Sequence, residues 1–251
     1  MNRVLDRLII VTGALALVFG ICTWLVRDSK GNVHYYEGDN TVKLCEYIEL
    51  QMLKTDTELI PYDGDRIRIQ YRSIMPISVM LGDNRLIITE SDELKLTLMT
   101  GDPEQFRLRL YLPKNIYKSI IVTAASGDVD IGRIDADAVA VTTKSGAITA
   151  TETRSQMNLV SGSGDISLGF ESVISGSAIS TRSGNAQILF PSGSSVALAY
   201  ETETGEFSSD LISGSVEGSF MYSFSGGANL IRAEVQSGTL TVNEYDAEDE
   251  K

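Results

Sequence analysis

The chain has 251 residues and a formal net charge of −13, with 34 acidic and 21 basic side chains. This acidity excludes nucleic acid as a partner and flat docking on anionic lipid, because both present negative charge. The 2 cysteines are Cys22, which lies in an apolar segment, and Cys45, so we expect no intrachain disulfide.

Residues 8–26 read LIIVTGALALVFGICTWLV and contain no charge. A helix of this length spans about 28 Å, close to the thickness of the hydrocarbon core of a bilayer. We therefore predict one N-terminal transmembrane helix, with residues 1–7 as a short cytoplasmic tail and residues 27–41 as a juxtamembrane segment. A cleaved signal peptide is the alternative, but cleavage at the small residues Ala14 and Ala16 would leave half of the apolar run on the protein.

The charges favour one orientation. Residues 31–251 hold 17 of the 21 basic and 32 of the 34 acidic side chains, a net charge of −15, while the short segment before the helix carries Arg3 and Arg7. We expect a single-pass protein of the cell membrane with a cytoplasmic N-terminus and an extracytoplasmic C-terminal domain. The lipid bilayer is then a partner through residues 8–26.

Residues 42–243 are predicted to form one all-β ectodomain. Short runs of alternating apolar residues are separated by turn sequences such as Asp63-Gly64 and Asp83-Asn84. No window shows a clean helical stripe; the segment 42–54 comes closest, and its β-branched and aromatic content fits a strand equally well. Residues 244–251 are predicted to be an acidic disordered tail.

A Ser-Gly phrase recurs in the C-terminal half, most clearly over residues 119–243. Its glycines are Gly127, Gly146, Gly164, Gly184, Gly205 and Gly238, at steps of 19, 18, 20, 21 and 33 residues. A fixed period of this size is typical of a solenoid. We predict a parallel β-solenoid with two short strands per rung of ~20 residues, in which glycine gives the corner its backbone freedom and the stacked hydroxyls bond neighbouring rungs.

Alternation along each strand predicts which side chains face the core. The residues expected to point inward are Val139, Val141, Ile148, Leu159, Ile166, Leu168, Ile179, Ile188, Val196 and Leu198. The long last step indicates an insertion with a strand pair or loop around residues 220–224. We expect residues 230–242 to follow it as the final rung that caps the open end.

These residues resemble a bacterial family of cell-envelope proteins labelled "putative adhesin" or β-strand-repeat proteins, which includes the LiaG-like proteins. The resemblance covers residues 42–242, from the segment Leu59 to Asp65, through Leu110 to Lys114 and the serial Ser-Gly-Asp repeats, to Leu189 to Ser192. It implies a membrane-attached parallel β-solenoid, in some members linked to envelope stress. Ala147, Asn185, Glu206 and Thr239 stand where the family phrase has aspartate.

The sequence contains no recognisable catalytic constellation. His34 is the only histidine, so a Ser-His-Asp relay would depend on a residue beside the predicted membrane helix. The aspartates Asp128, Asp130 and Asp165 are weak candidates for a cation site, but the residue after each Ser-Gly is not repeated as a ligand ladder would require. We expect no metal, no cofactor and no enzymatic activity, with a carbohydrate-active enzyme as the minority hypothesis.

Phe220, Tyr222 and Phe224 form a candidate interaction patch, for which a local core under the insertion is the alternative explanation. The leading hypothesis is a membrane-anchored extracytoplasmic β-solenoid that binds or scaffolds an envelope protein or polymer. A self-assembling structural element, through self-association of the rods, is the second hypothesis.

Overall fold

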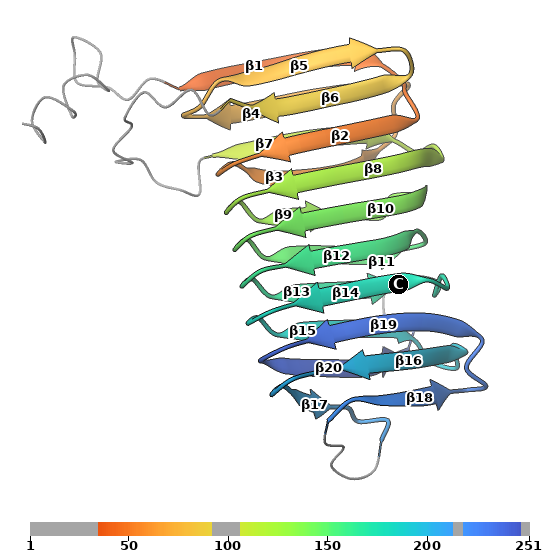
Figure 1. The fold of residues 1–251 in the computed structure, drawn as a ribbon. Coiled ribbons are helices and arrows are strands. Elements are labelled where there is room, and N and C mark those ends of the chain that lie inside the picture. Colours follow the sequence, from red (N-terminus) through yellow and green to blue (C-terminus); the bar gives the residue numbers. More distant parts are fainter. Residues whose placement is uncertain (1–34, 92–105, 213–217, 247–251) are drawn as a thin grey trace, which may run out of the picture.

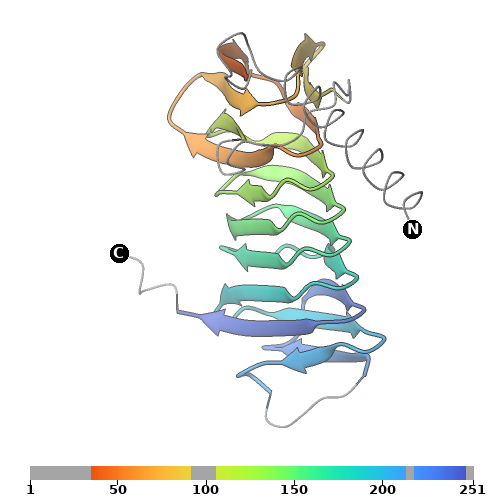
Figure 2. The same cartoon turned by 90° about the vertical axis from the view of Figure 1, so that its left-hand side faces the viewer.

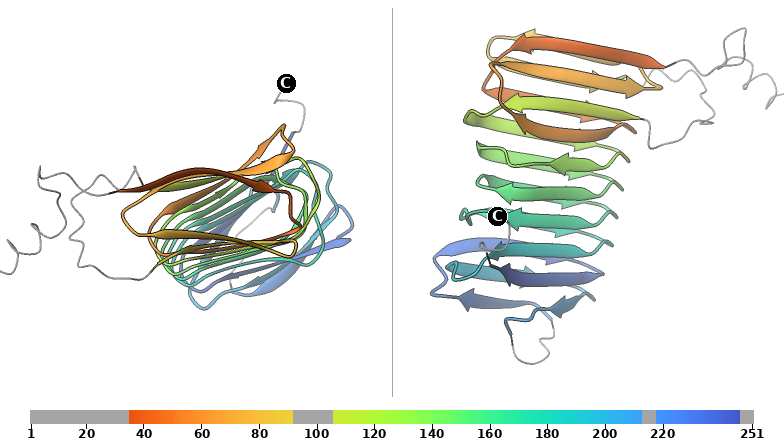
Figure 3. Two further views of the ribbon diagram at one scale, coloured as in Figure 1. Left: turned by 90° about the horizontal axis from the view of Figure 1, so that it is seen from above. Right: turned by 180° about the vertical axis from the view of Figure 1, so that it is seen from behind.

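The protein is described by a computed structural model that covers residues 35–91, 106–212 and 218–246. These residues form two facing ten-stranded sheets, stacked as a column (Figures 1 and 2). Seen along the column, the two sheets are the long sides of a flattened coil (Figure 3, left). The all-β class and two sheets dominated by parallel pairing are confirmed. The predicted transmembrane helix over residues 8–26 lies outside the described residues.

Sheet 1 contains, in spatial order, β1 (Tyr36–Lys43), β4 (Arg66–Ser73), β7 (Arg107–Pro113), β3 (Asp56–Tyr62), β9 (Val129–Ile131), β11 (Ile148–Thr153), β13 (Ile166–Phe170), β15 (Ala186–Pro191), β20 (Thr239–Tyr245) and β17 (Glu206–Ser208). Sheet 2 contains, in the same direction, β5 (Ile77–Gly82), β6 (Arg85–Glu90), β2 (Tyr47–Met52), β8 (Tyr117–Ala124), β10 (Ala136–Thr143), β12 (Gln156–Ser161), β14 (Ser177–Thr181), β19 (Asn229–Val235), β16 (Val196–Glu201) and β18 (Phe220–Phe224).

Each rung in the middle of the column is one strand of sheet 2 followed by one strand of sheet 1, as in β10 and β11. The strands stack in parallel, and their register follows the repeat: Val141 of β10 pairs with Val122 of β8 and with Leu159 of β12. All ten residues predicted to face the core are buried, at 2 % exposure or less, so the inward pattern is confirmed. Full burial of such aliphatic side chains contributes about 1.5–3 kcal/mol each.

The Ser-Gly corners bring successive rungs into close contact. A Cβ built on Gly146 would lie 2.0 Å from the carbonyl oxygen of Gly127, and one on Gly164 would lie 2.1 Å from that of Gly146. Among the repeat glycines only Gly238 has a positive φ, so the expected need for backbone freedom is wrong for the others. Glycine is required there because the neighbouring rung leaves no room for a side chain.

The serines of the same corners bond from rung to rung. The hydroxyl of Ser145 donates to the Ala125 carbonyl at 3.4 Å, that of Ser163 to Lys144 at 3.4 Å, and that of Ser237 to Arg182 at 3.0 Å. The predicted hydroxyl contacts between rungs are confirmed. Inside the corner, the hydroxyl of Thr143 donates to the backbone carbonyl of Gly146 at 2.7 Å, so this buried acceptor has a hydrogen-bond partner.

The order of rungs in space differs from their order in the chain at the C-terminal end. We predicted residues 230–242 as the capping rung, and this is wrong: β19 and β20 lie between the rung of β14 and β15 and the rung of β16 and β17. The chain runs outward through β18, which pairs antiparallel with β16, and returns to the inner edge of β16 as β19. Gly238 accordingly stacks on Gly184, and Gly205 stacks in turn on Gly238: a Cβ on Gly238 would lie 2.4 Å from the Gly184 oxygen, and one on Gly205 would lie 2.8 Å from the Gly238 oxygen.

The N-terminal end of the column also departs from chain order. β6 and β7 stack outside β2 and β3, and the antiparallel strands β5, β4 and β1 complete the two sheets there. The segment 42–54, whose pattern was ambiguous, contains the strand β2. The first strand starts at Tyr36, within the segment expected to link membrane and solenoid, and β20 extends to Tyr245 at the start of the expected acidic tail.

A buried carboxylate joins three segments near this end. Glu90 is 3 % exposed and accepts hydrogen bonds from the backbone N–H groups of Leu53, Lys54 and Thr55 and from the hydroxyls of Thr55 and Ser73. Burial by itself would raise the pKa of Glu90, but these donors outweigh it and hold that pKa below its usual value. The ionised side chain is therefore part of the folded state.

Gly146→Ala should destabilise the fold, because the added Cβ overlaps the Gly127 carbonyl. We expect a loss of about 1–3 kcal/mol in the free energy of unfolding, measured by urea denaturation followed by circular dichroism. Gly82→Ala is the matched control, because nothing lies within 4 Å of a Cβ at that position. Equal stability of the two variants would contradict the close-contact explanation.

Glu90→Gln should remove a pH-dependent part of the stability. Because the folded pKa is depressed, the carboxylate stabilises the protein above the unfolded pKa of about 4.3, and this contribution is lost as the pH falls through the folded pKa. The difference in unfolding free energy between wild type and variant should therefore be largest near neutral pH and shrink below pH ~4. A difference that does not change with pH would contradict this role.

Candidate binding face on sheet 1

The outer surface of sheet 1 carries a continuous row of polar side chains. Because the strands pair in register, outward residues of successive strands lie side by side. From the N-terminal end, the row contains Asp39, Gln70, Arg109, Glu58, Asp130, Thr149, Ser167, Gln187 and Thr241. No apolar side chain interrupts it, and the sheet can be followed from outside in Figure 3, right.

Three open hollows follow one another along this surface. The first has a volume of about 600 Å³ and is lined by residues that include Gln70, Arg72 and Arg107. The second, of about 320 Å³, lies between Glu58 and Thr149, and the third, of about 580 Å³, extends from Thr149 to Thr241. Thr149 lines both of the last two, so they adjoin. The outer surface of sheet 1 is therefore a shallow trough along the column.

The N-terminal part of the trough is rich in arginine, but its charges are paired. Glu58 binds Arg107 at 2.7 Å through Oε1 and Arg109 at 2.8 Å through Oε2. Asp39 binds Arg68 at 2.6 Å, and this hydrogen-bonded guanidinium lowers the pKa of Asp39 to about 2. Compensated pairs of this kind position side chains and leave little net positive charge.

The centre of the trough is acidic. Desolvation raises the pKa of Asp130, the neighbouring carboxylates of Glu58 and Asp128 raise it further, and a hydrogen bond from Thr149 acts in the opposite direction. Desolvation also raises the pKa of Asp56. Beyond Asp130, the row continues with hydroxyl and amide groups, each of which can both donate and accept hydrogen bonds.

Two of the candidate aspartates, Asp128 and Asp165, are engaged by the next rung. Asp128 Oδ1 accepts the backbone N–H of Ala147 at 2.8 Å, and Asp165 Oδ1 accepts that of Asn185 at 2.7 Å. Asn185 repeats the bond with Thr239 at 3.0 Å. This contact explains why aspartate or asparagine follows Ser-Gly. The described residues contain no cluster of three or more acidic, histidine or cysteine side chains suited to a metal ion.

The outer surface of sheet 2 differs in character. Its corresponding row contains Met80, Ile87, Glu49, Ile121, Ala140, Asn158, Ala178, Arg232, Ala199 and Met221. Polar and apolar side chains alternate irregularly in it, and Met80, Ile121 and Met221 are exposed. A second outward row of sheet 2 is polar except at Val160; it contains Thr89, Gln51, Thr123, Thr142, Val160, Ser180 and Glu234. The row on sheet 1 differs from both in having no apolar side chain.

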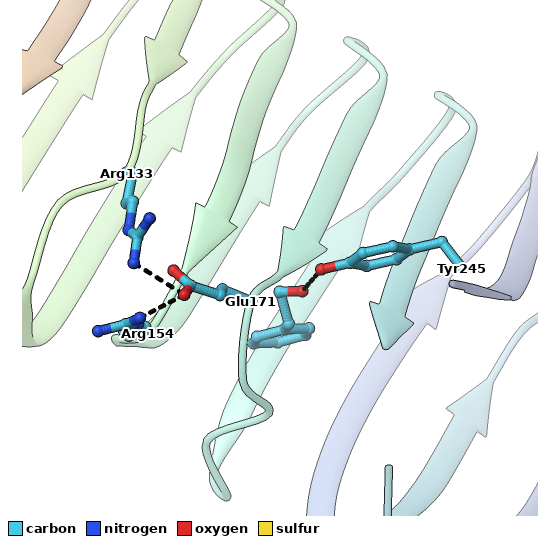
Figure 4. Close-up of polar contacts among 5 residues, drawn as sticks. Arg133, Arg154, Glu171 and Tyr245 are labelled. Carbon is cyan, nitrogen blue, oxygen red and sulfur yellow. Dashed lines mark hydrogen bonds and ion pairs between the residues drawn. The ribbon is translucent and has the colours of Figure 1, made fainter. Parts of the chain in front are cut away.

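Charged groups at the corners that follow sheet 1 also pair between rungs. Glu171 binds Arg133 at 2.8 Å and also Arg154, so one carboxylate joins the turns after β9, β11 and β13 (Figure 4). The hydroxyl of Tyr245 donates to the Phe170 carbonyl at 2.7 Å and ties the last strand to β13. Arg154 is thus held in a structural contact.

The three aromatic residues of the insertion share the core side of β18. Phe224 packs against Phe190, with ring centroids 5.7 Å apart, and Phe220 packs against Tyr200 and Phe207. Tyr222 contacts Phe224 with tilted rings whose centroids are 4.8 Å apart, and it is 39 % exposed. The adjacent Met221 points outward and is 72 % exposed. The three aromatic residues are two positions apart in the sequence, and this spacing places their side chains on one side of a strand.

Two further residues singled out in the sequence can be placed. Cys45 is buried, and desolvation raises the pKa of its thiol, so little of the reactive thiolate forms at neutral pH. His34 lies outside the described residues. No helix among the described residues is long and apolar enough to cross a membrane.

Comparison with known proteins places this architecture in a family. The chain is similar to a protein from Clostridium sporogenes ATCC 15579 described as a "putative cell adhesion protein", with 14% identity over 84% of this chain and 100% of that chain and a TM-score of 0.52. It is also similar to a "putative adhesin" from Bacteroides fragilis NCTC 9343, with 14% identity over 84% of this chain and 97% of that chain and a TM-score of 0.43. No curated protein matches the chain significantly.

A family model, Toastrack DUF4097, matches residues 45–154 and again residues 117–243. The two overlapping matches cover most of the described column and agree with its internal repeats. The resemblance stated from the Ser-Gly repeats is confirmed: the chain belongs to the toastrack family.

Proposed function

We propose that the protein is a membrane-anchored, extracytoplasmic binding module of the bacterial cell envelope, and that the outer surface of sheet 1 is its binding face. The polar row from Asp39 to Thr241, with the three hollows along it, is the observation that carries this proposal. The apolar run of residues 8–26 supports the anchor. The family resemblance supports a place in the envelope, in some members beside a stress-response system.

The geometry of the trough favours binding over catalysis. Its hollows are shallow and open to water, so they lack the solvent exclusion that strengthens electrostatic interactions in an active site. Its arginines are held by Glu58 and Asp39, and Asp128 and Asp165 are used by neighbouring rungs. Hydroxyls and amides of Thr149, Ser167 and Gln187 remain on the surface at intervals of about 4.8 Å, set by the strand spacing. Such a surface fits an extended partner rich in hydrogen-bonding groups.

Self-assembly remains the second candidate, and one feature of the fold supports it. Both edges of sheet 2, β5 and β18, contain no charged residue. Uncharged edge strands can pair with another chain. Light scattering on the detergent-solubilised protein over a range of concentrations separates the two functions, because a monomer at every concentration is incompatible with self-assembly.

Removal of hydrogen-bonding groups from the binding face should weaken attachment to the envelope. We expect the combined variant Thr149→Val, Ser167→Ala and Gln187→Ala to bind isolated bacterial cell walls at least about tenfold more weakly in co-sedimentation, since each lost hydrogen bond costs about 0.5–1.5 kcal/mol. The matched control carries Thr123→Val, Thr142→Val and Asn158→Ala on the outer surface of sheet 2. Equal losses in both variants would refute the assignment of the face.

The topology can be tested with one engineered thiol. In a Cys45→Ala background, chosen because Cys45 is buried, Ala247→Cys places a cysteine in the acidic tail. We expect a membrane-impermeant maleimide to label this protein in intact cells, while the parent without the tail cysteine stays unlabelled. Labelling that requires lysis would reverse the topology and make the protein a scaffold of the inner face.

A further inference from the structure

The strand β5 is an exposed edge without a charged residue, a composition that it shares with β18 at the opposite end of the same sheet. It is the outermost strand of sheet 2 at the N-terminal end of the column, pairing only with β6 among the described strands (Figure 1). Its sequence, ISVMLG, has no charged residue. Ile77 and Val79 pack against the core, whereas Met80 is 53 % and Leu81 44 % exposed.

An uncharged, exposed edge normally pairs with another chain or is covered. The corresponding edge of sheet 1 is protected differently, because β1 carries Glu37, Asp39 and Lys43. At the far end, the edge of sheet 1 is β17, which has only 3 residues. The edge strand β5 has 6 residues and no charged side chain, so neither kind of protection applies to it. We therefore expect another surface to cover this edge.

The chain itself indicates what lies near β5. The predicted membrane segment ends at residue 26, and β1 begins at Tyr36, at the same end of the column as β5. Fully extended, residues 27–35 reach at most about 30 Å. This end of the column therefore stays close to the bilayer, while β18 lies roughly 40 Å away, because ten strands stack at about 4.8 Å.

The residues beside Met80 and Leu81 suit a membrane surface. Arg85 follows the turn after β5, pairs in register with Tyr47, and lies 5.6 Å from its ring centroid. Tyrosine and arginine are favoured where hydrocarbon meets water. Arg85 also binds Glu49 at 3.4 Å, and Asp83 occupies the turn, so the surface gains no net positive charge. It therefore fits zwitterionic headgroups better than anionic ones.

We propose that the β5 edge, through Met80 and Leu81, rests on the zwitterionic lipid surface of the bilayer, so that the column stands on the membrane and its binding face runs up one side of the column from the bilayer. This inference rests on the proposed membrane anchor. The backbone groups of β5 that pair with no described strand stay hydrated in the headgroup layer, and only the two side chains enter the apolar boundary.

Two exposed methionines on the outer side of the same sheet provide the test. The full chain, with its single tryptophan replaced by Trp24→Phe, receives either Met80→Trp or Met221→Trp at the opposite end. Each protein is reconstituted in phosphatidylcholine vesicles whose acyl chains are brominated near the headgroup. We expect bromine to quench the fluorescence of the Met80→Trp protein several-fold more than that of the Met221→Trp protein, and Leu81→Asp to reduce this quenching.

The other outcomes reject the proposal in distinguishable ways. Equal quenching at both positions would mean that the column lies flat on sheet 2. If the protein floats with the vesicles but the tryptophan at position 80 is not quenched by bromine, the anchor holds and the edge does not touch lipid. If that tryptophan is then shielded from iodide in the aqueous phase, and the shielding disappears when the protein is diluted, a second copy of the chain covers the edge. Failure to float with the vesicles would refute the anchor itself.

Discussion

The contact between glycines of successive rungs is the constraint on which the structure depends. At the Ser-Gly corner, the carbonyl of one rung occupies the space that a side chain would fill in the next, about 2 Å from the Cβ position of Gly146 or Gly164. This approach fixes the stacking of neighbouring rungs at one point. The core residues, the corner hydroxyls and the outward side chains then all repeat in register, because each follows the glycine at a constant distance along the strand.

The same register explains how an acidic chain forms an ordered column. Carboxylates that would otherwise repel along a stack are bonded to the adjacent rung, as Asp128 is to the backbone of Ala147, or to arginines of neighbouring strands, as Glu58 is to Arg109. Beyond these pairs, the row on sheet 1 continues with hydroxyl and amide groups such as Ser167 and Gln187. Their regular spacing along an open surface is the reason for placing the proposed binding face there and not in an enclosed pocket.

The edge strands of the two sheets differ between the two ends of the column. At the C-terminal end, β18 folds back against β16 and places Phe220 and Phe224 over the core. At the N-terminal end, antiparallel strands extend both sheets, and the buried Glu90 at the end of β6 accepts the N–H groups of the turn between β2 and β3. The ends therefore carry the irregular residues of the protein, including the uncharged strand β5 beside the expected membrane.

The all-β class, the rung length, the inward residues such as Val141 and Leu168, and the hydroxyl contacts at the corners could all be predicted from the amino-acid sequence, because they depend on spacing along one strand. The C-terminal half of the polar row follows from the same repeat, since Thr149, Ser167 and Gln187 are separated by 18 and 20 residues. The order of the rungs could not be predicted in this way and is visible only in the folded chain. Each rung presents the same apolar stripe and the same Ser-Gly corner, so local pattern cannot tell which rung it will stack on. The insertion of β19 and β20, the meeting of Arg109 with Glu58, and the burial of Glu90 all depend on that long-range choice.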